Sequence, residues 1–177
     1  MPKDFDLDIP KIGHVLAVRY ERNKKFDVFS EGIYQKQLWN GYNSDHALFC
    51  HVAISSGGPH LVNITPPRAR LRNIQKVYKG RYVKFLKYNG ADFEYKRKKI
   101  ALIYNAIAAN LPYDWRGALA FIIPWMKQLP TRFFCSEACY TAYKMFYSDF
   151  RKKPEDCMPA YFVDSPDFEV VWEGFIN

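Results

Sequence analysis

A cysteine at the apparent start of a helix is the feature of this sequence best suited to chemistry. Cys135 enters an amphipathic stretch from a loop, and Ser136 and Glu137 are typical of a first helical turn. Unpaired backbone N–H groups and the positive end of the helix dipole stabilise a thiolate at such a position. Cys135 is therefore a candidate nucleophile, and the plainer alternative is a buried structural thiol. The apolar positions at helical spacing are Ala138, Ala142, Met145 and Phe146.

A thiol hydrolase also needs a base beside the sulfur and a third polar group that orients the imidazole. His51, in one predicted strand, and Asn63, in the next, have these chemistries. Other groupings stay open, with His46 or His60 as the base or with Cys139 as the nucleophile. A histidine in a strand is more often structural than catalytic, and residue types alone do not give distances.

The residues around His51 predict an antiparallel hairpin. Residues 48–55 and 60–65 are rich in strand-forming side chains, and a Gly-Gly-Pro turn separates them. Successive side chains of a strand point to opposite faces, so His51 faces away from its two neighbours. Asn63 shares the face of His51 in one of the two hairpin registers.

The remaining elements give an α+β pattern in one domain, residues 1–177, without repeats or a linker. Residues 111–117 predict a loop rich in side chains that recognise ligands, and the apolar segment 118–126 follows it. Further strands are predicted at 11–20, 81–88, 161–163 and 169–172, a loop at 40–45, and helices at 26–39, at 92–109 with Asp92 as cap, and after Cys135.

Composition describes a chain that folds and carries excess positive charge. Its 177 residues include 26 lysines and arginines against 18 aspartates and glutamates, for a net charge of +8. Almost half of the residues are apolar, which excludes disordered and fibrous classes. The charge favours an anionic partner such as an anionic lipid, a wall polymer or nucleic acid, although no recognised nucleic-acid motif accompanies it.

Four cysteines form neither a dense disulfide framework nor the paired spacing of a zinc site, so we expect no metal and no cofactor. A metal site of Cys135 and Cys139, at i and i+4 on one helix face, with His51 or His60 is the alternative. The polar Met-Pro-Lys-Asp start lacks the features of a signal peptide. We therefore expect a cytoplasmic protein, or one carried in a virion or released on lysis. The apolar run 118–126 is too short to cross a bilayer.

Four short motifs together resemble one family, the circularly permuted NlpC-type, papain-like cysteine hydrolases. Residues 50–54 (CHVAI) and 61–67 (LVNITPP) resemble the family's "s-H-V-g-I … v-I-E-a-t-P" hairpin. Residues 133–138 (FFCSEA) resemble its "f-f-C-S-E-l" helix start. Residues 12–16 (IGHVL) are similar to its "G-D-v-l" first strand, and 111–115 (LPYDW) to its "p-Y-d" loop.

The resemblance implies a permuted papain-like fold, in which an antiparallel sheet or small barrel packs on helices and the nucleophile begins a helix. It implies Cys135 as nucleophile, His51 as general base and acid, and Asn63 as the orienting residue. The chain order histidine, orienting residue, nucleophile is the mark of the permuted group. Implied substrates are a peptide, including the stem peptide of peptidoglycan, or an acyl lipid. The alternative is a catalytically silent basic binding protein that keeps the fold.

Two residues depart from the family pattern. Asn63 stands where an acidic residue is often found, which keeps an acceptor for the imidazole and removes its charge. His14 replaces the aspartate of the opening motif, and we interpret it as structural. Candidates for substrate binding or for holding the oxyanion are Tyr113, Asp114 and Ser136.

Overall fold

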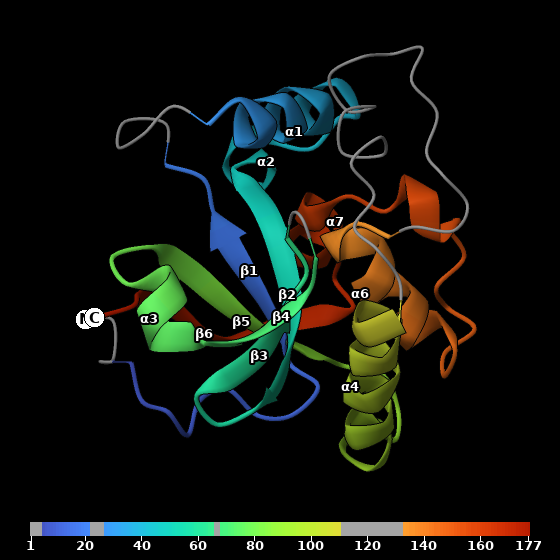
Figure 1. Ribbon diagram of the computed structural model, residues 1–177. Helices are drawn as coiled ribbons and strands as arrows, with labels where there is room; N and C mark the ends of the chain where they lie inside the picture. Colours follow the sequence, from blue (N-terminus) through green and yellow to red (C-terminus); the bar gives the residue numbers. More distant parts are fainter. Residues whose placement is uncertain (1–4, 22–26, 66–67, 111–132) are drawn as a thin grey trace.

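The computed structural model describes residues 5–21, 27–65, 68–110 and 133–177, and shows an α+β fold (Figure 1). The predictions for Tyr113, Asp114, the loop 111–117 and the apolar segment 118–126 lie outside the described residues.

One antiparallel sheet of six strands, in the order β4-β3-β2-β1-β5-β6, forms the centre of the molecule. The central strand β1 pairs with β2 on one side and with β5 on the other. Among the described strands the sheet is open, with β4 and β6 at its edges, so the predicted antiparallel sheet is present without closing into a small barrel. The strands are β1 Val15–Arg19, β2 Phe49–Gly57, β3 His60–Asn63, β4 Arg70–Asn73, β5 Tyr82–Tyr88 and β6 Phe168–Phe175.

The predicted hairpin is β2 and β3, joined at Gly57 and Gly58, which both have positive φ. Such a backbone conformation is available to glycine at little cost, so the chain can reverse tightly here. Ser55 on β2 pairs with Leu61 on β3, so their side chains share one face of the sheet. Side chains an even number of positions away along each strand point to that same face, and His51 is four positions before Ser55 while Asn63 is two positions after Leu61. His51 and Asn63 therefore share a face.

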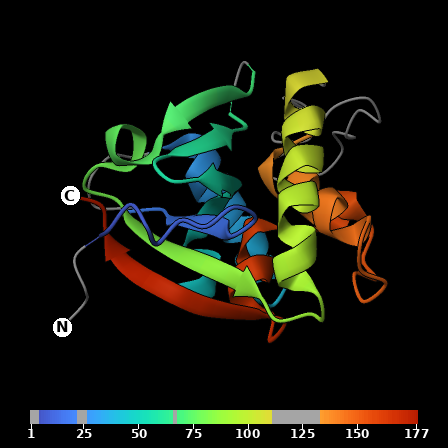
Figure 2. The same cartoon turned by 90° about the horizontal axis from the view of Figure 1, so that it is seen from below.

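Two groups of helices pack against this sheet, and both groups contact β2. Helix α4 packs against α6, and both contact β2, while α1 and α2 lie over the far end of β2 (Figures 1 and 2). The helices are α1 Val28–Trp39, α2 Ser44–Ala47, α3 Ile74–Tyr78, α4 Phe93–Asn110, α6 Cys135–Lys144, the short 3-10 helix η1 Pro154–Asp156 and α7 Pro159–Asp164.

The core lies between the sheet and the helices α4 and α6. Leu16, Val52 and Ile100 are fully buried there, and the aromatic rings of Tyr88 and Tyr143 pack at 5.7 Å. The Tyr143 hydroxyl donates to the carbonyl of Gly13 at 2.6 Å, which links α6 to the entry of β1. This packing fixes the C-terminal part of α6 against the sheet.

Most predicted elements are confirmed, including β1, the hairpin, β5, β6, α1, α4 and α6. The strand predicted at 161–163 is wrong, because these residues belong to α7, which Pro159 begins. The loop predicted at 40–45 runs into the short helix α2. Asp92 precedes α4, but with a positive φ of 60° it does not adopt the extended backbone typical of a cap. Among the described residues, no helix has the length and apolar character needed to cross a membrane.

Candidate active site

Cys135 is the first residue of α6, as the sequence predicted. Phe134, in extended conformation, precedes it, and the Phe134 backbone N–H lies 3.5 Å from the Glu137 carboxylate. This contact is typical of a helix start, and an acidic side chain in the first turn also complements the helix dipole. Ser136 is fully buried, and its hydroxyl donates to the Cys157 carbonyl at 2.6 Å. The first turn of α6 is therefore held firmly on both sides of the thiol.

The Cys135 thiol is turned toward the middle of β2. Backbone N–H groups of Val52, Ser136 and Cys135 itself hydrogen-bond the sulfur, and these bonds lower the pKa of the thiol. Burial has the larger and opposite effect, and the net result raises the Cys135 pKa to about 11. Val52 directly follows His51 in β2, so α6 places the sulfur against the strand that carries the base singled out by the sequence.

His51 and Asn63 are in direct contact. The Nε2 atom of His51 lies 2.7 Å from Oδ1 of Asn63. An amide oxygen only accepts hydrogen bonds, so Nε2 carries the proton and Nδ1 is left as the acceptor of the neutral ring. Burial lowers the pKa of His51 to about 4, and the bond to Asn63 opposes this shift only in part. A neutral imidazole in a fixed tautomer results.

Cys135, His51 and Asn63 line one pocket of about 700 Å³. One wall comes from α1 and its cap, where Val28, Phe29 and Ile33 are apolar and Asp27 and Ser30 are polar. The rest comes from the strands, from α3 and from the start of β5. The other lining residues are Val18, Arg19, Tyr20, Cys50, Ile64, Thr65, Val77, Tyr78 and Arg81.

Tyr78 is a site residue that sequence reasoning missed as part of this chemistry. Its ring lies 6.4 Å from the ring of His51, between centroids, and its side chain lines the same pocket. The hydroxyl is buried and has no hydrogen-bond partner among the described residues. The nearby Cys135 and, above all, burial raise the Tyr78 pKa, so the hydroxyl keeps its proton. No motif marks Tyr78, because its position depends on how α3 packs beside β4.

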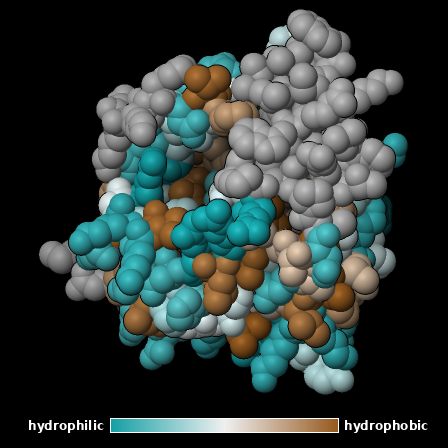
Figure 3. Space-filling view, viewed as in Figure 1, coloured by the Kyte–Doolittle hydropathy of each residue, from teal (hydrophilic) through white to brown (hydrophobic). Residues whose placement is uncertain are grey.

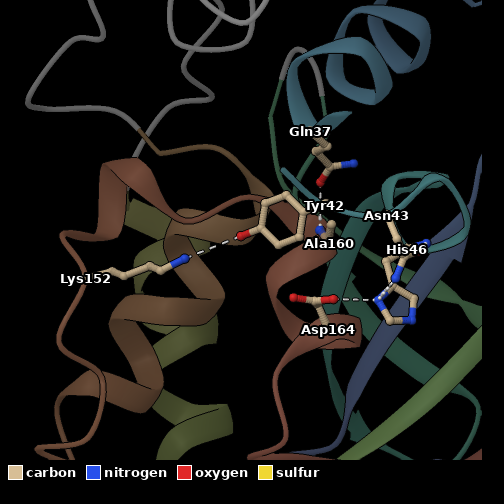
Figure 4. A network of polar contacts seen from close by, with 7 residues as sticks. All are labelled: Gln37, Tyr42, Asn43, His46, Lys152, Ala160 and Asp164. Atoms are coloured by element: carbon tan, nitrogen blue, oxygen red, sulfur yellow. Dashed lines mark hydrogen bonds and ion pairs between the residues drawn. The ribbon is translucent and has the colours of Figure 1, made fainter. Parts of the chain in front are cut away.

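The competing groupings are not assembled at this pocket. Nδ1 of His46, in α2, lies 2.7 Å from an oxygen of Asp164, at the end of α7, and a separate hydrogen bond joins Lys152 to the Tyr42 hydroxyl nearby (Figure 4). His60 is exposed at the hairpin turn. Cys139 is fully buried one turn into α6, and burial raises its thiol pKa well above the usual value.

Of the three residues predicted to bind substrate or hold the oxyanion, the structure describes Ser136 alone. The hydroxyl of Ser136 is committed to the Cys157 carbonyl, so only its backbone N–H faces the sulfur. Tyr113 and Asp114 lie outside the described residues. Among the described residues, no three histidine, cysteine, aspartate or glutamate side chains gather as a metal site would require.

A scan against models of protein families finds no match to this chain, and a search of curated proteins finds no similar sequence.

Proposed function

We propose that this protein is a thiol-dependent hydrolase with a permuted papain-like fold, in which Cys135 is the nucleophile, His51 the base and Asn63 the residue that orients the base. The 2.7 Å contact between His51 Nε2 and Asn63 Oδ1, made in the wall of the pocket that Cys135 also lines, carries the proposal.

The protonation states favour a proton transfer that accompanies attack. Burial keeps both the Cys135 thiol and the His51 imidazole neutral. As the sulfur attacks a carbonyl carbon, its proton passes to Nδ1 of His51 and a carbon–sulfur bond forms. The imidazolium then gives this proton to the leaving group. Water, activated by the same ring, cleaves the thioester and restores the thiol.

The negative charge on the carbonyl oxygen needs donors within the same pocket. The backbone N–H groups at the start of α6 point to the thiol, and that of Cys135 is the first candidate. The Tyr78 hydroxyl, protonated, buried and without a described partner, is the second. We assign both to the oxyanion.

The pocket suits a substrate with an apolar part. The side chains of Val28, Phe29 and Ile33 line its α1 wall, so an acyl chain or an apolar peptide side chain fits there. The scissile bond is an amide or an acyl ester, and the candidate substrates are peptides, peptidoglycan stem peptides and acyl lipids.

A substrate screen tests the proposal. Muropeptides, phospholipids and acyl esters are incubated with the protein, with Cys135→Ala and with Cys50→Ala, and product is followed by mass spectrometry. Cys50 lines the same pocket but donates its thiol proton to the Ser30 and Ala47 carbonyls, so it is the matched control. We expect turnover of one class that is lost in Cys135→Ala and kept in Cys50→Ala. Equal turnover in both variants would exclude Cys135 as the nucleophile.

A catalytically silent binding protein is the second candidate, and one observation favours it. The raised pKa leaves the Cys135 thiol protonated near neutral pH, as in a purely structural cysteine. Binding of one substrate class without turnover in the same screen would support this candidate.

A further inference from the structure

We propose that the surface formed by β4, α3 and the turn into β5 docks this protein on an anionic lipid bilayer, with the catalytic pocket opening beside the contact. We call this surface the basic face. Its cations are Arg68, Arg70, Arg72, Lys76, Lys79 and Arg81.

The charge of the basic face is not balanced within the described structure. No aspartate or glutamate occurs in the sequence between Asp45 and Asp92. Of the eight lysines and arginines in this interval, Lys84 pairs with Glu173 and Lys87 with Glu94. None of the six cations of the basic face forms an ion pair with a described residue. A field of one sign at a surface attracts an anionic partner and weakens with added salt.

Aliphatic side chains stand among these cations. Leu71 is 65% exposed on the edge strand β4, where its side chain points to the opposite face from those of Arg70 and Arg72, and Val77, next to Lys76 on α3, is 38% exposed. In the view of Figure 3 the region over β4 and α3 is largely hydrophilic, with hydrophobic side chains beside it. Cations that bind headgroups, next to aliphatic groups that enter the acyl boundary, are the combination that an anionic bilayer recognises.

A single-stranded nucleic acid fits this surface less well. Proteins that bind single strands stack the bases on exposed aromatic rings. The only aromatic residue among 68–81 is Tyr78, and it is 6% exposed. The exposed apolar groups of the basic face are aliphatic, which favours lipid.

The basic face is continuous with the catalytic pocket. Val77, Tyr78 and Arg81 line that pocket, and Arg70 on the edge strand β4 pairs with Asn63. Docking through β4 and α3 would therefore bring the pocket close to the lipid surface. The docking itself follows from charge and exposure, whereas its link to an acyl-lipid substrate rests on the proposed function.

Vesicle co-sedimentation tests the docking. The probes are vesicles of phosphatidylcholine alone and of phosphatidylcholine and phosphatidylglycerol in equal parts. Arg70→Gln/Arg72→Gln is compared with Lys98→Gln/Lys99→Gln, which removes the same charge from exposed residues of α4. Each basic residue at an anionic bilayer adds about five-fold in partitioning, so the first variant should bind about 30-fold more weakly and the second about as well as the unmodified protein. Leu71→Ser should weaken binding several-fold without changing the charge.

Several outcomes would overturn the proposal. These are equal binding to both vesicle types, equal losses in the two double variants, and binding of a DNA duplex with no binding to vesicles. Circular dichroism checks that each variant is folded. Cys135→Ala should bind vesicles as the unmodified protein does, so failure of docking and failure of catalysis are read separately.

Discussion

Two histidines of this sheet, His51 in β2 and His14 at the entry of β1, differ in their surroundings, because His51 is half-buried in the wall of a pocket and His14 is buried. The His51 Nε2 atom binds Asn63, and the ring lines a pocket that contains Cys135. His14 is 4% exposed and stacks on Phe93 at 6.1 Å, and neither of its ring nitrogens has a hydrogen-bond partner among the described residues.

The comparison shows that a shifted pKa does not by itself mark a functional histidine. Burial is the largest cause in both cases, and it lowers the pKa of His14 as well as that of His51 to about 4. Cations near His14, chiefly Arg97, add to its shift, although Glu94 opposes them. His51 differs from His14 because Asn63 orients its ring and because the ring lines the pocket that Cys135 also lines. We therefore propose a catalytic role for His51 and a structural one for His14.

Activity separates the two histidines most strongly. His51→Ala should lower kcat/KM by about 10³-fold or more, because it removes the acceptor of the thiol proton. His14→Leu should leave kcat/KM within about three-fold, since the ring does not line the pocket. Steady-state kinetics on the substrate found in the screen gives both values. Comparable losses in the two variants would remove the distinction.

The dependence of stability on pH should not separate the two histidines, because burial lowers both pKa values to about 4, and it tests the buried state of His14 directly. A histidine whose pKa is about 4 when folded and 6.5 when unfolded takes up a proton first in the unfolded chain. Stability is therefore fully present above pH 6.5 and falls as the pH drops toward 4, by on the order of 3 kcal/mol for His14. Urea unfolding across this range should show a smaller loss for His14→Leu than for the unmodified protein. Parallel curves for the two proteins would contradict the buried, neutral state of His14.

Asn63 is expected to act through His51 rather than on the substrate. Asn63→Ala should lower kcat/KM about 10- to 100-fold, because Nε2 loses the oxygen that fixes its tautomer. Asn63→Asp should recover most of this loss. It should also move the acid limb of the pH–rate profile to higher pH, since a carboxylate stabilises the imidazolium and so raises the pKa of His51. An unchanged acid limb in Asn63→Asp would argue against the contact.

Tyr78→Phe should have the smallest effect on the reaction. Loss of one of several donors to the oxyanion should lower kcat about 10-fold and leave KM nearly unchanged. His51→Ala, measured in parallel, gives the loss in kcat against which the effect of Tyr78→Phe is compared. A rise in KM with unchanged kcat would instead place the Tyr78 hydroxyl on the bound substrate.

Local sequence signals account for the elements that carry the site. The alternating residues around His51 and the helical spacing after Cys135 are patterns of single segments, and the hairpin and α6 form where those patterns predict. The Tyr-Phe-Val run at 161–163 has strand-forming side chains, but Pro159 starts a helix there. Met145, predicted on the apolar face of α6, is 61% exposed, because the helix ends at Lys144.

How segments that are far apart in the sequence pack together cannot be predicted from such local patterns. The contact of Cys135 with β2 depends on the packing of α6 against a strand more than 80 residues earlier in the chain. The position of Tyr78 depends on α3, a helix of five residues in a stretch of ambiguous pattern. Residue types could therefore name the nucleophile, base and orienting residue as candidates, but only the fold brings them to one pocket.

Site-resolved alkylation with iodoacetamide tests the central claim most directly. The rate at each of the four cysteines is followed by mass spectrometry in the unmodified protein and in His51→Ala. We predict that Cys135 reacts faster than Cys50, Cys139 and Cys157, and that His51→Ala slows Cys135 alone. A Cys135 that reacts no faster than Cys50, at a rate that His51→Ala leaves unchanged, would contradict a thiol activated by His51.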